Sequence, residues 1–550
     1  MDPVETVDNR RRSIGGVRFK LILHMTVAFA CDEPATDKNR NDVQMSCGGL
    51  RVAALPPKQV DVWAPAKAGC RGFGLRDHMV ERTADIGDVA RRVFLSGIGL
   101  GALACALLAD TAARAESLPE ALVKAYQTNP QLNAERARQR ATDENVPQAL
   151  AGYRPQVAAS LSAGLQAVRD QLPGNVLQTA TLKPWQIGLT VTQTLFNGFK
   201  TANSVRVAEL QVQSGREALR NVGQGVLLDA VTAYTNVLAN QTLVEAQRAN
   251  VAFLKETHAI TLRRLNAGDV TPTDTAQAEA RLNRGLADLN AAEVNFAVSQ
   301  ATYAQVVGNP PSQLRPADTT DRLLPRSRED AIGLALREHP AVTAAGFDVD
   351  VASTSIRVAE SSLMPNVTVQ GSVSKNRDSD TSLSTFGTDQ ASVIGQITQP
   401  IYDGGTAASQ TRQAKEVATQ SRLVLDQVRN QAKTAVVSAW VANEGAKVAV
   451  SASESEVKAA EVALAGVQKE AAGGQRTTVD VLNAQQDLIT ARARLIGAQR
   501  DRVIASYTLL SAIGRLDVKT LNLKTPDYLP EVHYHQVRDA WHGLRTPSGQ

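Results

Sequence analysis

The chain has little of several residue types, and each scarcity narrows its function. Its cysteines, Cys31, Cys47, Cys70 and Cys105, all precede residue 116, which excludes disulfides and cysteine metal sites from the rest of the chain. Aromatic residues make up only 4% of the 550 residues, which is low for a protein with a thick globular core. A net charge of only +4 gives no indication of a nucleic-acid partner. There is no P-loop, nucleophile constellation or dinucleotide motif, so we expect no enzyme activity, catalytic residue, metal or cofactor.

Residues 79–115 have the order of a secretory signal peptide. Basic residues precede the apolar run 93–109, and Ala113-Arg114-Ala115 follows as an A-x-A cleavage site. We therefore expect an exported chain whose mature form begins at Glu116, with a transmembrane anchor as the alternative. Residues 1–78 precede this signal and mix Gly, Pro and charges without periodicity, so we interpret them as a non-native or disordered extension.

The remainder of the chain is predicted to be two copies of one unit. Asn129-Pro130 matches His339-Pro340 at an offset of 210 residues, and Gln193–Gly198 matches Gln399–Gly404 at 206. Because this period is far longer than that of a solenoid, it indicates a duplicated domain. The predicted parts are a first repeat at 116–308, a proline-rich linker at 309–326, a second repeat at 327–515 and a C-terminal tail at 516–550.

A seven-residue turn occurs once in each copy. Gly268–Asp274 and Gly474–Asp480 both read G-x-x-T-x-x-D between long helical stretches. The glycine suits the left-handed position just past a helix end. Thr271 and Thr477 are N-cap residues, and the acid three positions later completes a capping box. Each turn therefore predicts a tight reversal between two antiparallel helices.

Apolar and polar residues alternate in two segments of each copy. The segments are 157–166, 185–192, 367–374 and 392–398. Alternation with a period of two predicts strands with one apolar and one polar face. A soluble, half-buried sheet is one interpretation. Four such strands in an exported chain, with aromatic residues near their ends, favour an outer-membrane barrel.

The strand count has a consequence for assembly. Roughly eight strands are needed to close even the smallest barrel, and lipid does not tolerate open sheet edges. If these strands span a membrane, the chain must therefore oligomerise. The polar segments 169–182 and 375–389 are predicted to be loops that join the strands on the outer side, and the Ser-, Thr-, Gln- and Gly-rich face suits a water-filled lumen.

Proline is absent from 198–267 and from 404–472, so each stretch is predicted to be a helix on the order of 100 Å long. The second stretch has a coiled-coil spacing of three and four residues. The positions in this series are Leu425, Val428, Ala432, Ala435, Ala439, Ala442, Ala446 and Ala449.

Shorter predicted helices flank the strands of each copy. They cover 131–152 and 273–307 in the first copy, and 341–363 and 477–513 in the second. Two short helices stacked end to end would match the length of one long helix. We therefore predict a long antiparallel helical shaft, with the strands at one end and the two turns at the other.

Over about residues 117–515 the sequence resembles the TolC family of outer-membrane channel proteins. The resemblance rests on the duplication, on the strand-to-helix joints Gln193–Gly198 and Gln399–Gly404, and on both turns, above all Gly474–Leu482. It implies a mixed α/β membrane protein. In this family a trimer forms one 12-stranded outer-membrane β-barrel, continued by a long periplasmic α-helical barrel.

The resemblance also implies a function and partners. A passive trimeric exit duct would carry drugs or proteins from a periplasmic pump to the exterior, in tripartite efflux, type I secretion or both. Its partners would be outer-membrane lipid, a periplasmic adaptor (membrane fusion) protein and an inner-membrane pump of the RND, ABC or MFS class. A periplasmic coiled-coil scaffold without a channel is the alternative, and the exported substrate stays open.

Residue roles follow from the same resemblance. Asp274 and Arg476 match tip residues that link neighbouring helices and hold the periplasmic entrance closed, and Asp480 matches an acidic ring at the aperture. A latch tyrosine and a second acid of some relatives align near Ala471 and with Asn483, so one latch contact is absent and the ring is less negative. Simple helix capping is the compatible alternative for both aspartates. The implied adaptor-docking tips comprise Gly268, Thr271, Asp274, Gly474, Thr477, Asp480, Val481 and Leu482.

Overall fold

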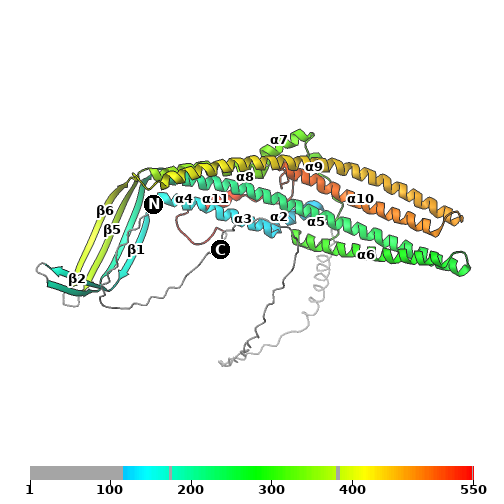
Figure 1. The fold of residues 1–550 in the computed structure, drawn as a ribbon, viewed down its shortest axis with the longest axis horizontal. Coiled ribbons are helices and arrows are strands. Elements are labelled where there is room, and N and C mark those ends of the chain that lie inside the picture. Colours follow the sequence, from blue (N-terminus) through cyan, green and yellow to red (C-terminus); the bar gives the residue numbers. More distant parts are fainter. Residues whose placement is uncertain (1–114, 173–175, 380–384, 548, 550) are drawn as a thin grey trace, which may run out of the picture. The chain divides into compact units, whose positions relative to one another are not determined.

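The computed structural model describes residues 115–172, 176–379, 385–547 and 549, so the predicted extension and nearly all of the predicted signal peptide lie outside the described residues. The first half of the described chain carries three short α-helices and a 3-10 turn, then four strands and a long helical hairpin (Figure 1). In chain order the elements are α2 (Leu118–Thr128), α3 (Pro130–Asp143), α4 (Asn145–Leu150), η1 (Ala151–Tyr153), β1 (Gln156–Ala163), β2 (Gln166–Leu172), β3 (Val176–Leu182), β4 (Trp185–Asn197), α5 (Lys200–Ala267) and α6 (Pro272–Val307).

The second half repeats this order with two strands and then adds a C-terminal helix. Its elements are η2 (Asp321–Leu323), α7 (Arg328–Glu338), α8 (Pro340–Glu360), η3 (Ser361–Leu363), β5 (Asn366–Ser379), β6 (Thr385–Thr398), α9 (Thr406–Ala472), α10 (Thr478–Ile513) and α11 (Pro530–Val537).

The two long helices form where proline is absent. Helix α5 has 68 residues and α9 has 67, each about 100 Å long at 1.5 Å per residue. No helix of the described chain combines the length and the apolar character that a membrane crossing requires. Both helices follow a strand, and both end at a glycine, Gly268 and Gly473.

The end-to-end stacking of short helices is confirmed. Helices α2, α3 and α4 pack on α5, and α6 packs on it as well, while α8 and α10 lie along α9 (Figure 1). Equivalent caps begin α3 and α8: Asn129 Oδ1 accepts the Gln131 N–H at 2.9 Å, and His339 Nδ1 accepts the Ala341 N–H at 3.2 Å. The duplication therefore extends to local hydrogen bonding.

The principal core lies where the short helices meet the long ones. Tyr234 of α5 is fully buried, and its ring centroid is 6.3 Å from that of Tyr303 on α6. The Tyr234 hydroxyl lies 2.7 Å from the Arg315 carbonyl oxygen, and burial raises the pKa of Tyr234 to about 12. Leu516 and Val518, which follow α10, pack in the same cluster, so the C-terminal tail begins as part of the core.

The seam of α9 differs by one residue from the predicted coiled-coil series. Ala432 and Ala439 are buried as expected, but Ala435 and Ala442 are exposed, and their neighbours Val436 and Asn443 are buried instead. The pattern alone does not fix the rotation of the helix, because an alanine stripe on α9 is wide enough to offer two seams. One side of the stripe is left uncovered in the single chain.

The strands form a four-stranded antiparallel sheet in the order β1-β4-β5-β6, together with a separate hairpin of β2 and β3. The prediction of loops at 169–182 and 375–389 is wrong: β2, β3 and the outer parts of β5 and β6 occupy most of these residues. Their polar composition suggested loops. Cross-strand pairing satisfies backbone groups whatever the side chains are, so a hairpin forms there nonetheless.

Candidate functional site

The four-stranded sheet carries its apolar residues on one face. Register places Leu161 opposite Ile187 and Leu189 opposite Val373, so odd-numbered apolar residues of neighbouring strands lie side by side. These side chains are exposed; Leu161, for example, keeps 76% of its surface accessible. A sheet face with this much uncovered apolar area requires a partner, since monomeric soluble proteins seldom expose such patches.

The opposite face of the sheet is polar. Thr190 pairs with Ser372, and the Ser372 and Ser392 hydroxyl oxygens are 2.9 Å apart. Ile394 is an apolar exception on this polar face. It interrupts the alternation in the sequence and lies opposite Gln370. The predicted two-faced sheet is therefore present, with one side suited to lipid and the other to water.

Both edges of this sheet are open in the described chain. Strand β1 pairs only with β4, and β6 pairs only with β5. Edge strands present unpaired backbone N–H and C=O groups. The sheet therefore offers two edges that can accept further strands.

The joints between strands and long helices are braced in the same way in both repeats. Gln193 Nε2 donates to the Tyr153 carbonyl at 3.1 Å, and Gln399 Nε2 donates to the Leu363 carbonyl at 3.1 Å. Each glutamine thus ties the end of a strand to the 3-10 turn that precedes the repeat's first strand. The sheet is fixed to the helices through side chains that the sequence motif Gln-x-x-x-x-Gly already marked.

At the other end of the long helices, the two predicted turns have the predicted geometry. Gly268 and Gly474 adopt φ of 85° and 77°, in the left-handed region where glycine carries no steric penalty. Thr271 N–H donates to Asp274 Oδ2 at 2.9 Å, and Thr477 N–H donates to Asp480 Oδ2 at 3.0 Å.

These hydrogen bonds change the acidity of the tip aspartates. Bonding to the Thr271 backbone and hydroxyl lowers the pKa of Asp274 below its ordinary value, and Thr477 lowers the pKa of Asp480 in the same way. Both carboxylates are therefore ionised and engaged in their own caps, so the capping role is satisfied in both.

Arg476 makes the two tips unequal. Its Nε donates to Glu470 Oε2 at 2.9 Å, and this hydrogen bond to a carboxylate raises the pKa of Arg476. The arginine is thus held by the last turn of α9, within its own hairpin. In the part of the chain that the structure describes, neither a hydrogen bond nor an ion pair joins Arg476 to Asp274, so the single chain does not bring these two predicted site residues together.

Contacts between the two hairpins lie just behind the tips. Arg281 Nη2 of α6 donates to Asn483 Oδ1 of α10 at 2.9 Å, and Gln485 Nε2 of α10 donates to the buried Asn250 Oδ1 of α5 at 2.8 Å. Sequence reasoning assigned no inter-hairpin contact to any of the four. Asn483 was noted only as the neutral substitute for an acid, and the remaining three carry no motif.

Leu482 reinforces this inter-hairpin contact. Its side chain is 2% exposed and packs with Leu254 of α5 and Ala278 of α6. Among the predicted docking residues, Leu482 therefore lies inside the chain's own packing. The Gly268, Thr271, Gly474 and Thr477 positions are exposed at the tips.

Comparison with known proteins agrees with this geometry. The family model described as "Outer membrane efflux protein" matches residues 121–309 and 331–515, one segment in each repeat. The outer membrane efflux protein BepC of Brucella suis is 40% identical over 468 residues, which cover 84% of this chain and 97% of BepC. The outer membrane protein TolC of Vibrio cholerae is 29% identical over 75% of this chain and 94% of its own length.

Solved structures show the same fold. The outer membrane protein VceC of Vibrio cholerae superposes with a TM-score of 0.60 at 18% identity, covering 72% of this chain and 96% of VceC. With the duplicated helical hairpins, the two-faced sheet and a family match in both repeats, the chain belongs to the outer membrane efflux protein family and is an outer-membrane protein with a periplasmic helical domain.

Proposed function

We propose that three copies of this chain assemble into a passive exit duct through the outer membrane. The observation that carries this proposal is the four-stranded amphipathic sheet with an open edge on each side. Two copies would supply eight strands, whose interior side chains fill. Three copies would supply twelve strands and a wider barrel with room for a water-filled lumen.

The two faces of the sheet indicate which side would contact lipid and which would face water. The exposed apolar face, with Leu161 and Val393, would contact lipid, and the Ser- and Thr-rich face would line the lumen. This orientation also supports the channel over a periplasmic coiled-coil scaffold. A scaffold would leave the apolar face in water.

The helical part is proposed to close into a tunnel in the same assembly. The uncovered side of the α9 stripe, with Ala435, Ala442 and Ala449, is small and apolar, and it suits close packing of another helix. A neighbouring copy would bury this stripe. Twelve helical strands, four from each copy, would then surround the continuation of the lumen.

The duct would export drugs or proteins with energy supplied by a partner. In this proposal a periplasmic adaptor protein docks on the tips Gly268–Asp274 and Gly474–Asp480 and connects the duct to an inner-membrane pump of the RND, ABC or MFS class. The exposed cap residues Thr271 and Thr477 give the two docking turns one shared geometry. Similar turns would let one type of adaptor hairpin bind both sites.

The tips are also the proposed gate. Asp480 would contribute one carboxylate per copy to a ring at the aperture, and Arg476 and Asp274 would link hairpins of neighbouring copies. Arg476 is exposed and its partner Glu470 lies on the same hairpin, so in this proposal Arg476 would exchange Glu470 for a neighbouring copy's Asp274. Docking of the adaptor would then compete for these groups.

A matched pair of substitutions tests the orientation of the sheet. Leu161→Lys places a charge on the proposed lipid face, where lysine costs roughly 2–4 kcal/mol at the bilayer midplane. Ser160→Lys places the same charge one residue away, on the proposed lumen face. We expect native mass spectrometry of detergent-extracted protein to show trimers for wild type and Ser160→Lys, and a strong loss of trimer for Leu161→Lys. Equal yields for both variants, or a trimer that is released without detergent, would contradict the proposal.

Deleting the gene tests which class of cargo the duct exports. Increased drug susceptibility with an unchanged secreted proteome would assign efflux, and the reverse would assign type I secretion.

A further inference from the structure

The C-terminal tail runs back along α5 toward the strands. Leu523 packs in the cluster that contains Leu227, whereas Tyr534 packs with Val212. As the tail proceeds, its partners on α5 thus become progressively nearer to the strand end of that helix. The 15 residues from Leu227 to Val212 correspond to about 22 Å along the helix axis.

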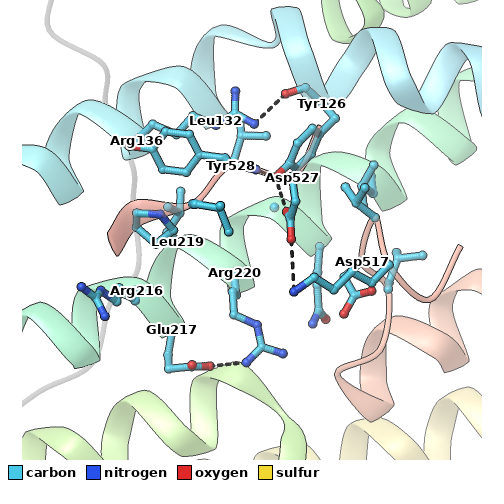
Figure 2. Close-up of a pocket in the computed structure, with 18 of the residues that line it drawn as sticks. Tyr126, Leu132, Arg136, Arg216, Glu217, Leu219, Arg220, Asp517, Asp527 and Tyr528 are labelled. Carbon is cyan, nitrogen blue, oxygen red and sulfur yellow. Dashed lines mark hydrogen bonds and ion pairs between the residues drawn. The ribbon is translucent and has the colours of Figure 1, made fainter. Parts of the chain in front are cut away.

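Specific contacts hold the tail on this course. Figure 2 shows Arg136 of α3 beside the rings of Tyr126 and Tyr528, with guanidinium-to-centroid distances of 4.6 and 5.1 Å. Further along, His533 Nδ1 lies 2.9 Å from Asp143 Oδ2. Stacking and hydrogen bonds of this kind define a single path for the chain beyond residue 515, where the family match ends.

The path ends at the joint between helix and strand. Arg154, two residues before β1 begins, donates from Nη1 to the Ala540 carbonyl at 2.7 Å. Its guanidinium also lies 4.6 Å from the centroid of the Trp541 ring. One arginine therefore fixes both the backbone and the indole of the tail beside the first residues of the sheet.

The residues held there are exposed and apolar. Trp541 keeps 68% of its surface accessible, and Leu544 is fully exposed. The same level of the chain carries other exposed apolar side chains at the strand-to-helix joints, so the tail extends an existing belt. The belt residues at the joints are Tyr153, Phe199, Met364, Ile401 and Tyr402.

We propose that residues 538–545 bind the phospholipid headgroup region of the periplasmic leaflet of the outer membrane, with Trp541 and Leu544 inserted. This proposal rests on the proposed function, because the strands must span the membrane for their periplasmic ends to lie at its surface. Tryptophan prefers this interface, since its ring is apolar and its N–H still needs a hydrogen-bond partner. The exposed Arg545 beside Leu544 would face lipid phosphate.

The geometry favours lipid, rather than a second copy of the chain, as the partner that covers Trp541 and the exposed belt. The tail meets the sheet at Arg154, on the same joints that carry the exposed belt, and a membrane whose surface lies at those joints would cover Trp541 and the belt together. A bound neighbouring copy is the competing outcome of the experiment below.

Tryptophan quenching by brominated lipids tests the proposal on the full chain. The sequence has four tryptophans, Trp63, Trp185, Trp440 and Trp541, so subtracting the spectrum of Trp541→Phe from that of wild type isolates the tail signal. The protein is reconstituted in phosphatidylethanolamine and phosphatidylglycerol vesicles whose acyl chains are brominated either near the headgroup or deep in the bilayer. We expect the Trp541 signal to be quenched at least twofold more by the shallow bromines, and we expect Arg154→Ala to reduce that quenching.

Two further subtractions distinguish the outcomes. Subtracting the spectrum of Trp440→Phe isolates a tryptophan of α9 that should not be quenched. Subtracting that of Trp185→Phe isolates the tryptophan at the first residue of β4. If Trp185 is quenched and Trp541 is not, the tail proposal is overturned while the channel stands. A blue-shifted Trp541 that neither set of bromines quenches in the vesicles would assign its cover to a neighbouring copy. If the protein does not float with the vesicles and Trp185 is not quenched, the channel proposal fails and the tail proposal fails with it.

Discussion

Arg281 of α6 donates a hydrogen bond to Asn483 of α10, with the two atoms 2.9 Å apart, and so joins the first helical hairpin to the second near their tips. The residues are 202 positions apart in the chain. An outward movement of the second hairpin that is larger than these side chains can follow would break this bond. We therefore propose that the gate of the duct would include this contact inside each copy as well as the proposed contacts between copies.

Replacing this arginine should favour the open entrance. Arg281→Ala removes a hydrogen bond worth about 1 kcal/mol, which corresponds to a roughly fivefold shift in an opening equilibrium. Sensitivity of cells to vancomycin, which is too large for an intact outer membrane, measures the leak. Arg284→Ala, three residues further along α6 and exposed, is the matched control. Identical sensitivity of the two variants would exclude Arg281 from the gate.

The Glu470–Arg476 pair gives a second prediction, in which removing the carboxylate of Glu470 does not open the entrance. Both groups are about half exposed, so the pair itself contributes little to stability. In our account Glu470 competes for Arg476 with Asp274 of a neighbouring copy. The double substitution Asp274→Ala with Arg476→Ala should therefore leak vancomycin, whereas Glu470→Gln should not. A leak from Glu470→Gln as large as that from the double variant would show that the pair within one hairpin keeps the entrance closed.

His339 should make the stability of the chain depend on pH. Burial lowers the pKa of His339 below its ordinary value of 6.5, and the neutral ring accepts the Ala341 N–H as the cap of α8. The unfolded chain therefore binds the proton more readily than the folded chain. Below about pH 6.5, acidification should lower the free energy of unfolding until the folded-state pKa is passed.

The internal repeat supplies the matched variant for that prediction. Asn129 caps α3 at the equivalent position with an amide that does not titrate. We expect His339→Asn to keep the cap and to flatten the difference in thermal unfolding temperature between pH 7.5 and pH 5.5. An equal acid shift in wild type and His339→Asn would assign the pH dependence to other groups.

The sequence predicted the parts of this structure that depend on local chemistry. The two G-x-x-T-x-x-D turns, the proline-free helices and the alternating strands each follow from the preferences of a few adjacent residues. The same local argument failed for strands β2 and β3, whose polar residues suggested a loop. These strands are held by backbone pairing, which the polarity of the side chains does not reveal.

Features that depend on how helices rotate against one another were not predictable. The buried seam of α9 uses Val436 and Asn443 where the pattern allowed Ala435 and Ala442. The contact of Asn250 with Gln485 likewise depends on two helices, 235 residues apart in sequence, meeting at one level. The course of the tail to Arg154 belongs to the same class, because residues 516–550 have no counterpart in the first repeat from which to infer it.

Single-channel recording in planar lipid bilayers tests the central claim most directly. Detergent-extracted trimers of the full chain should insert and conduct ions, with a low conductance that rises in the Asp274→Ala, Arg476→Ala variant as the periplasmic entrance opens. Trimers of correct mass that bind to the bilayer and leave it non-conducting, in both wild type and this variant, would contradict the exit duct and favour the scaffold.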